Sequence, residues 1–78
     1  MAEELTTRVI NTIAATQRMD ASRITPESTF QDLGIDSMDA INIVFALENE
    51  FNINIPDDDV RGIRSVADVI AGISRLTS

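Results

Sequence analysis

Apolar residues recur at a helical period in three stretches of the chain. These stretches cover residues 2–17, residues 37–51 and residues 65–76. The first carries Leu5, Val9 and Ile13 at four-residue spacing, which places them on one face of a helix. The third begins with Ser-Val-Ala-Asp, a capping box that marks a helix start. The spacing therefore predicts three principal helices.

A long connection, residues 18–36, separates the first two predicted helices. Apolar residues recur along it, and we expect them to pin the loop over the core: Met19, Ile24, Phe30, Leu33 and Ile35. The sequence Thr-Pro-Glu at residues 25–27 is typical of a single short turn. Gly34 indicates a corner of positive φ just before the second helix.

The segment between the second and third helices alternates Asn-Ile-Asn-Ile over residues 52–55, as a strand would. We interpret it as a loop, because it is short, has no partner strand and ends at Pro56. Residues 57–61 then predict a short helix that ends near Gly62. The expected fold is all-α, a small four-helix bundle of three principal helices and one short helix, with a long loop between the first and second. We expect one domain over residues 1–78.

The second helix carries two apolar groups on different sides, placed by steps of about 100° per residue. One group forms the expected core face: Ala40, Ile43, Val44, Leu47 and Phe51. The other comprises Met38, Ile41 and Phe45, and polar residues border it: Asn42, Glu48 and Asn49. Packing on both sides of the helix would explain the second group, and so would a surface for a partner protein. On the residues alone, both explanations stay open.

Composition excludes several classes of function. The 78 residues carry a formal charge of −7, from 13 acidic and 6 basic residues, so the surface repels nucleic acid and favours basic patches on other proteins. The chain has no cysteine and no histidine, which removes the usual zinc ligands and the usual general base. The aspartates at 57–59 lack the spread-out ligands of a calcium loop. We expect neither a self-sufficient enzyme nor a metal site.

The first residues lack the basic start and apolar core of a signal peptide. No apolar stretch reaches the length that spans a membrane. We therefore expect no membrane insertion and a cytoplasmic location.

Ser37 is the residue on which a covalent chemistry would depend. No histidine or lysine exists to activate it, so it is not a hydrolase nucleophile. A serine at a helix start is commonly just a residue that suits that site, and Asp36 before it is the expected N-cap, with Asp39 three residues on as in a capping box. Alternatively, a separate enzyme modifies its hydroxyl, since backbone N–H groups at a helix start tolerate a phosphodiester. Asp36 and Asp39 oppose that charge unless a cation or a basic partner offsets them.

The sequence Asp-Leu-Gly-Ile-Asp-Ser-Met-Asp, residues 32–39, resembles the modification site of acyl carrier proteins. The resemblance continues through residues 45–51 and 55–58 to the closing helix that begins at Ser65. It implies that Ser37 receives 4′-phosphopantetheine from coenzyme A through a magnesium-dependent phosphopantetheinyl transferase. The thiol of that arm would hold acyl intermediates as thioesters for enzymes of fatty acid or related lipid biosynthesis.

The resemblance also implies a docking surface on the second helix for acyl-transferring and chain-elongating enzymes with basic patches. By position it comprises Asp36, Met38, Asp39, Ile41, Phe45 and Glu48. The chain departs from the family in having Met38 after the serine, and Asn42 and Asn49 in place of glutamates common in carriers of fatty acid synthesis. A specialised carrier of a polyketide, peptide or other dedicated acyl pathway is therefore an alternative, and an unmodified helical adaptor is another. A carrier that must visit many enzymes is expected to be a monomer.

Overall fold

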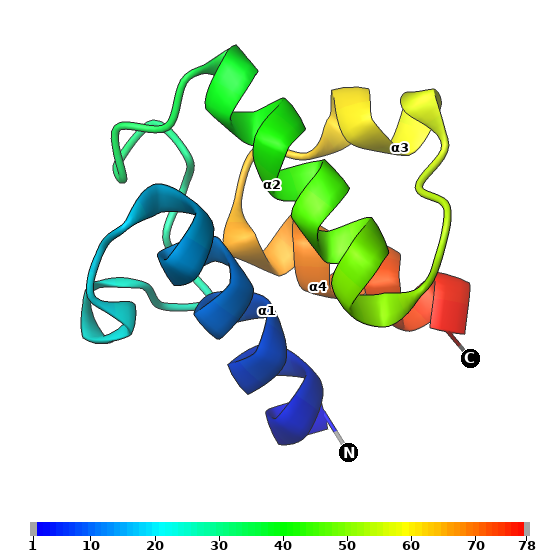
Figure 1. Ribbon diagram of the computed structural model, residues 1–78, viewed down its shortest axis with the longest axis horizontal. Helices are drawn as coiled ribbons and strands as arrows, with labels where there is room; N and C mark the ends of the chain where they lie inside the picture. The colour runs from blue at the N-terminus through cyan, green and yellow to red at the C-terminus, as the bar shows by residue number, and fades with distance from the viewer. Residues whose placement is uncertain (1, 78) are drawn as a thin grey trace.

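Helices make up the secondary structure of residues 2–77, the part of the chain that this computed structural model describes (Figure 1). Four α-helices and one short 3-10 helix follow in the order α1 (Ala2–Gln17), η1 (Ala21–Arg23), α2 (Ser37–Phe51), α3 (Asp57–Gly62) and α4 (Val66–Thr77). The predicted all-α bundle of three principal helices and one short helix is confirmed. The sequence did not predict η1, which Asp20 caps by accepting a hydrogen bond from the backbone N–H of Ser22 at 3.0 Å.

The core lies where α1 packs against both α2 and α4. Its fully buried side chains are branched aliphatic residues of these helices: Val9, Ile13, Ile43, Leu47, Val66, Val69 and Ile73. Burial of each such side chain contributes about 1.5–3 kcal/mol to folding. The apolar stripes read from the helical period are therefore the faces that the fold buries.

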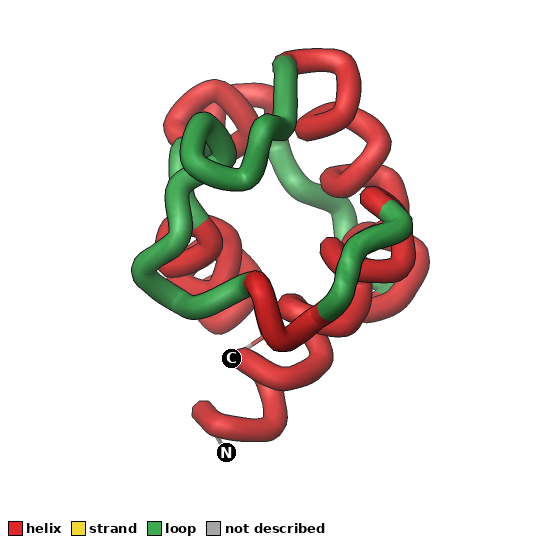
Figure 2. Tube along the Cα trace, turned by 90° about the vertical axis from the view of Figure 1, so that its left-hand side faces the viewer, coloured by secondary structure: helices red, strands yellow, loops and turns green. Residues whose placement is uncertain are grey.

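The long connection between α1 and α2 closes one end of the bundle, and Figure 2 shows it as the green segments facing the viewer. Ile24, Phe30 and Ile35 are buried, while Met19 and Leu33 pack against the core from partly exposed positions. The predicted pinning of this loop is confirmed. Residues 25–28 form the expected turn, in which the N–H of residue 28 donates to the carbonyl of residue 25 at 3.0 Å.

Backbone hydrogen bonds attach this loop to the start of α4. Phe30 N–H donates to the carbonyl of Arg64 at 3.0 Å, and Val66 N–H donates to the carbonyl of Ser28 at 3.0 Å. The two bonds flank an isolated antiparallel bridge between residues 29 and 65. The α3–α4 connection is thereby held against the segment that leads into α2.

The connection from α2 to α3 is a loop, as predicted. It begins at Asn52, whose left-handed backbone (φ +55°) ends α2. Ile55 is 9% exposed and plugs the core, while one side-chain oxygen of Glu48 accepts its N–H at 2.8 Å. This bond fixes the path of the chain between the two helices.

The start of α4 departs in one detail from the predicted capping box. Ser65 Oγ accepts the N–H of Asp68 at 3.2 Å, as expected. In return the N–H of Arg64 donates to Asp68 Oδ2 at 3.0 Å, one residue before the expected donor, Ser65.

Candidate functional site

Ser37 is the first residue of α2, and a different residue caps that helix. Asp36 has an extended backbone, and its Oδ1 accepts the N–H of Asp39 at 2.8 Å, which identifies Asp36 as the N-cap. Gly34 supplies the predicted corner with φ +73°. Ser37 is exposed, and its hydroxyl has no hydrogen-bond partner among residues 2–77. The predicted cap at Asp36 is therefore confirmed, and the Ser37 hydroxyl is available for other chemistry.

A hollow of about 580 Å³ opens beside Ser37, which we call the Ser37 pocket. The α1–α2 loop, the first turns of α2 and the end of α3 contribute its walls. Its apolar lining consists of Phe30, Ile35, Ala40, Ile41, Val60 and Ile63. A mostly apolar pocket of this size, with a few polar groups at its edge, is typical of a small-molecule site.

The second apolar group of α2 is exposed. Met38 is 74% exposed, Ile41 46% and Phe45 62%. Packing on both sides of α2, which was one of the two explanations, is therefore wrong. We call these three residues the apolar patch. Single exposed apolar residues are ordinary, but three on one helix face indicate a surface that contacts another molecule.

The acidic residues predicted for docking occupy different environments. Asp36 is exposed beside Ser37, and Asp39 is half-buried in the first turn. Glu48 is also half-buried, and its Oε2 is occupied by the Ile55 N–H. The structure thus gives Glu48 a role in holding the α2–α3 loop, a role that sequence reasoning missed because it depends on a contact between two elements.

Two arginines that sequence reasoning passed over lie near the site. Arg64 lines the Ser37 pocket. Arg61 lines a neighbouring groove of about 320 Å³ between α2 and α3, together with Ile41 and Phe45 of the apolar patch. Both are exposed. Their positions next to α2 follow from how α3 packs, and no spacing within α2 could have indicated them.

The two asparagines that depart from the family pattern face different surroundings. Asn42 is exposed on α2. Asn49 lines a groove between α1 and α2 with Arg8 and Thr12. Asn49 is exposed as well, and in the α2 helix both asparagines keep their predicted positions at the border of the apolar patch.

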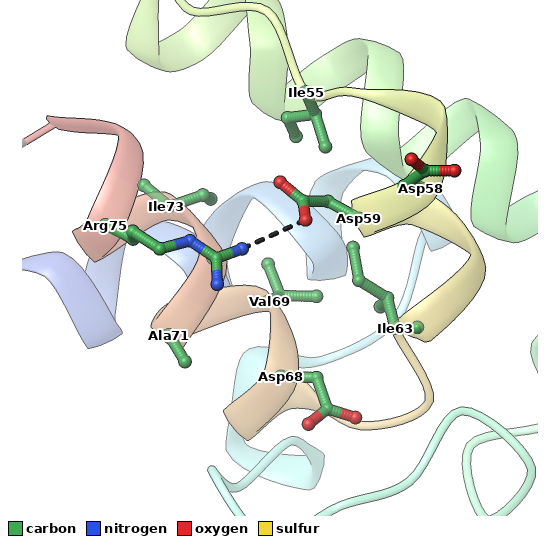
Figure 3. A pocket seen from close by; sticks show the side chains of 11 residues that line it. Ile55, Asp58, Asp59, Ile63, Asp68, Val69, Ala71, Ile73 and Arg75 are labelled. Carbon is green, nitrogen blue, oxygen red and sulfur yellow. Dashed lines mark hydrogen bonds and ion pairs between the residues drawn. The ribbon is translucent and has the colours of Figure 1, made fainter.

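A separate hollow of about 250 Å³ lies between α3 and α4 (Figure 3). Arg75 reaches across it and donates to Asp59 Oδ1 at 3.0 Å, and the apolar lining includes Ile55, Ile63 and Val69. Ser37 does not line it. Within residues 2–77, no group of three or more acidic, histidine or cysteine residues is arranged to hold a metal ion.

The sequence model of the phosphopantetheine attachment site matches residues 7–73. The chain belongs to this family. The group that its members carry is covalently attached 4′-phosphopantetheine. Ser37 is the exposed serine that adjoins a pocket at the start of a helix, so the residues present fit such a group.

Named relatives agree with this assignment. The chain is 44% identical over 64 residues to acyl carrier protein 2, mitochondrial, of Arabidopsis thaliana, covering 81% of this chain and 51% of that protein. It is 44% identical over 70 residues to a putative mitochondrial acyl carrier protein of Schizosaccharomyces pombe, covering 87% and 62%. The chain thus spans between about half and three fifths of the length of these relatives.

The fold agrees as well. The crystal structure of an acyl carrier protein from Thermotoga maritima superposes with a TM-score of 0.85 at 29% identity, covering 97% of this chain and 89% of that one. In the described residues, no helix is both long and apolar enough to cross a membrane.

Proposed function

We propose that the chain is an acyl carrier whose arm is attached at Ser37. One observation supports this assignment most directly: Ser37 is exposed at the start of α2, is free of any capping role, and borders an apolar pocket. We further propose that residues 1–78 act as one monomeric carrier domain. The attached arm would supply a thiol that holds an acyl group as a thioester.

The attachment reaction needs an enzyme other than this chain. The Ser37 Oγ–P bond forms as the P–O bond within the diphosphate of coenzyme A breaks, and adenosine 3′,5′-bisphosphate leaves. The hydroxyl proton must pass to a base. The chain has no histidine, and the carboxylate of the preceding residue, Asp36, already accepts the Asp39 N–H. A phosphopantetheinyl transferase therefore supplies the base and the magnesium ion, while Ser37 supplies an accessible oxygen.

The apolar patch and the acids beside it would form the docking surface for that transferase and for acyl-handling enzymes. Met38, Ile41 and Phe45 offer apolar area, and Asp36 and Asp39 lie at the start of α2, on either side of Ser37 and Met38 in the sequence. Acidic groups around an apolar centre favour partners that present basic residues around an apolar site, mainly by accelerating encounter. This is the surface at which partner choice would be made.

The attachment is tested by incubating the protein with coenzyme A, magnesium and a broad-specificity phosphopantetheinyl transferase, then measuring intact mass. Wild type should gain one phosphopantetheine, and Ser37→Ala should gain none. Ser74→Ala is the matched control, because Ser74 is also exposed on a helix but lies outside the Ser37 pocket. No gain in wild type would favour the unmodified adaptor instead.

The residue at position 42 bears on which biosynthetic pathway the carrier serves. We propose that a carrier without glutamate at this position is specialised away from housekeeping fatty acid synthesis. Asn42→Glu should raise turnover with a fatty acid synthase, because an added rim charge accelerates docking to a basic patch. Asn49→Glu is measured in parallel, because Asn49 is the second position without the glutamate and also lines the groove between α1 and α2. Equal turnover for wild type and Asn42→Glu would contradict specialisation through this charge.

The location of the protein in the cell is also a prediction. We expected a cytoplasmic protein, and the relatives from Arabidopsis thaliana, Schizosaccharomyces pombe and Dictyostelium discoideum are all named as mitochondrial. Those names do not confirm the cytoplasmic expectation.

A further inference from the structure

The surroundings of Ser37 pose an electrostatic problem for the arm. A phosphodiester on Ser37 Oγ adds a negative charge between Asp36 and Asp39, which are its neighbours in the first turn of α2. The backbone N–H groups at this helix start favour an anion, but the Asp36 carboxylate already takes the N–H of Asp39. A cation close to Ser37 would offset the repulsion.

Arg64 is the one basic residue among those that line the Ser37 pocket, which also includes Ser37 and Asp36. Its backbone is fixed on both sides: the N–H donates to Asp68 Oδ2 at 3.0 Å, and the carbonyl accepts the Phe30 N–H at 3.0 Å. The position of Arg64 at the edge of the pocket is therefore set by the loop bridge and by the cap of α4.

The side chain of Arg64 is not committed elsewhere in residues 2–77. The ion pairs found there join Arg8 to Glu50 and Arg75 to Asp59. Arg64 is exposed, and its guanidinium has no hydrogen-bond or ion-pair partner in the same residues. Asp36 lines the same pocket without forming an ion pair with it. A guanidinium in this position has all its donors available.

We propose that Arg64 pairs with the phosphodiester of the arm on Ser37 and directs the first part of the arm along the Ser37 pocket. The inference rests on the proposed attachment at Ser37. Guanidinium matches two phosphate oxygens with paired N–H donors, and it stays charged at every working pH. Arg64 is thus a positioning residue: it biases the arm toward the apolar wall of the pocket and away from solvent.

The test uses the whole chain in its arm-bearing form and compares Arg64→Gln with Arg61→Gln. Arg61 is a matched control, because it is exposed and close in sequence but lines the groove beside Phe45 and not the Ser37 pocket. Intact mass first confirms that each variant carries the arm. Phosphorus NMR line width then reports the mobility of the phosphodiester, and the Arg64 Nε–H resonance reports its hydrogen bonding.

Attachment of the arm to wild type should shift the Arg64 Nε–H resonance. The phosphorus line should narrow in Arg64→Gln and keep its wild-type width in Arg61→Gln, while Arg64→Lys should give an intermediate width. Salt at 1 M, where the Debye length is about 3 Å, should narrow the wild-type line toward that of Arg64→Gln.

Two results would overturn the role of Arg64 and leave the attachment at Ser37 standing. One is an Arg64 Nε–H resonance that is identical before and after attachment of the arm, and the other is equal narrowing of the phosphorus line in Arg64→Gln and Arg61→Gln. Absence of the mass gain in wild type would overturn the attachment at Ser37 and this inference with it. The two failures are distinguishable because the mass is measured before any spectrum.

Discussion

Glu48 was predicted to dock partners, but its carboxylate also accepts a hydrogen bond within the fold, so substitutions at Glu48 test a structural role. Its Oε2 accepts the Ile55 N–H at 2.8 Å from a half-buried position, and the Ile55 residue is 9% exposed. Glu48→Ala removes the acceptor and leaves a nearly buried N–H without a partner. Such an unsatisfied group costs about 1–3 kcal/mol, so we expect a loss of about 1.5 kcal/mol.

This loss is large enough to measure by urea unfolding followed by circular dichroism at 222 nm. A small domain has an m-value of about 1 kcal/mol/M in urea, so the midpoint should fall by about 1.5 M with m unchanged. In a thermal scan each kcal/mol corresponds to about 4–8 °C for a domain of this size, giving a drop in Tm of about 6–12 °C.

Glu48→Gln separates the effect of losing the hydrogen bond from the effect of losing the negative charge. It removes the same negative charge as Glu48→Ala but keeps a side-chain oxygen as acceptor, and a neutral acceptor gives a bond of roughly half the strength. The expected order of stability is wild type, Glu48→Gln, Glu48→Ala. If both variants were as stable as wild type or more stable, relief of repulsion in a chain of net charge −7 would outweigh the bond, and the structural role assigned to Glu48 would be refuted.

Three further predictions concern the loop, the core and pH. Gly34→Ala should cost about 1 kcal/mol in urea unfolding, because Gly34 has φ +73° while an added Cβ meets no atom within 4 Å, leaving backbone strain as the sole penalty; unchanged stability would contradict that conformation. Leu47→Ala should cost about 2–5 kcal/mol, since Leu47 is fully buried in the core, and a loss below about 1 kcal/mol would mean that the core collapses to fill the space. Asp20 should titrate below its ordinary pKa of 3.8, because the Ser22 backbone N–H and then its side chain hydrogen-bond the carboxylate. A pKa lowered in the folded chain gives a stability contribution that is fully present above pH 3.8 and is lost as pH falls through the folded pKa; carbon-detected NMR titration showing a pKa at or above 3.8 would contradict the cap.

Local features of the sequence were sufficient for the helices and for the position of Ser37. The helical period fixes which residues share a face whatever else the chain does, so the bounds of α1 and α2 and the core faces could be predicted. Asp36 and Gly34 likewise act on the backbone next to them, and each has the cap or the positive φ expected of it. Recognition of the motif around Ser37 depended on the same local order.

The tertiary structure alone decided what surrounds that serine. Exposure of Met38, Ile41 and Phe45 depends on whether another element covers that face of α2, and the sequence left both outcomes open. The role of Glu48 depends on the path of the following loop, and the nearness of Arg64 to Ser37 depends on hydrogen bonds from the α1–α2 loop to the start of α4. The helical period does not relate the residues that make these contacts, because the contacts depend on how separate elements pack against one another. The sequence by itself determined the helices and where an arm would be attached, and the packing of α3 and α4 decided which charges and apolar walls lie beside it.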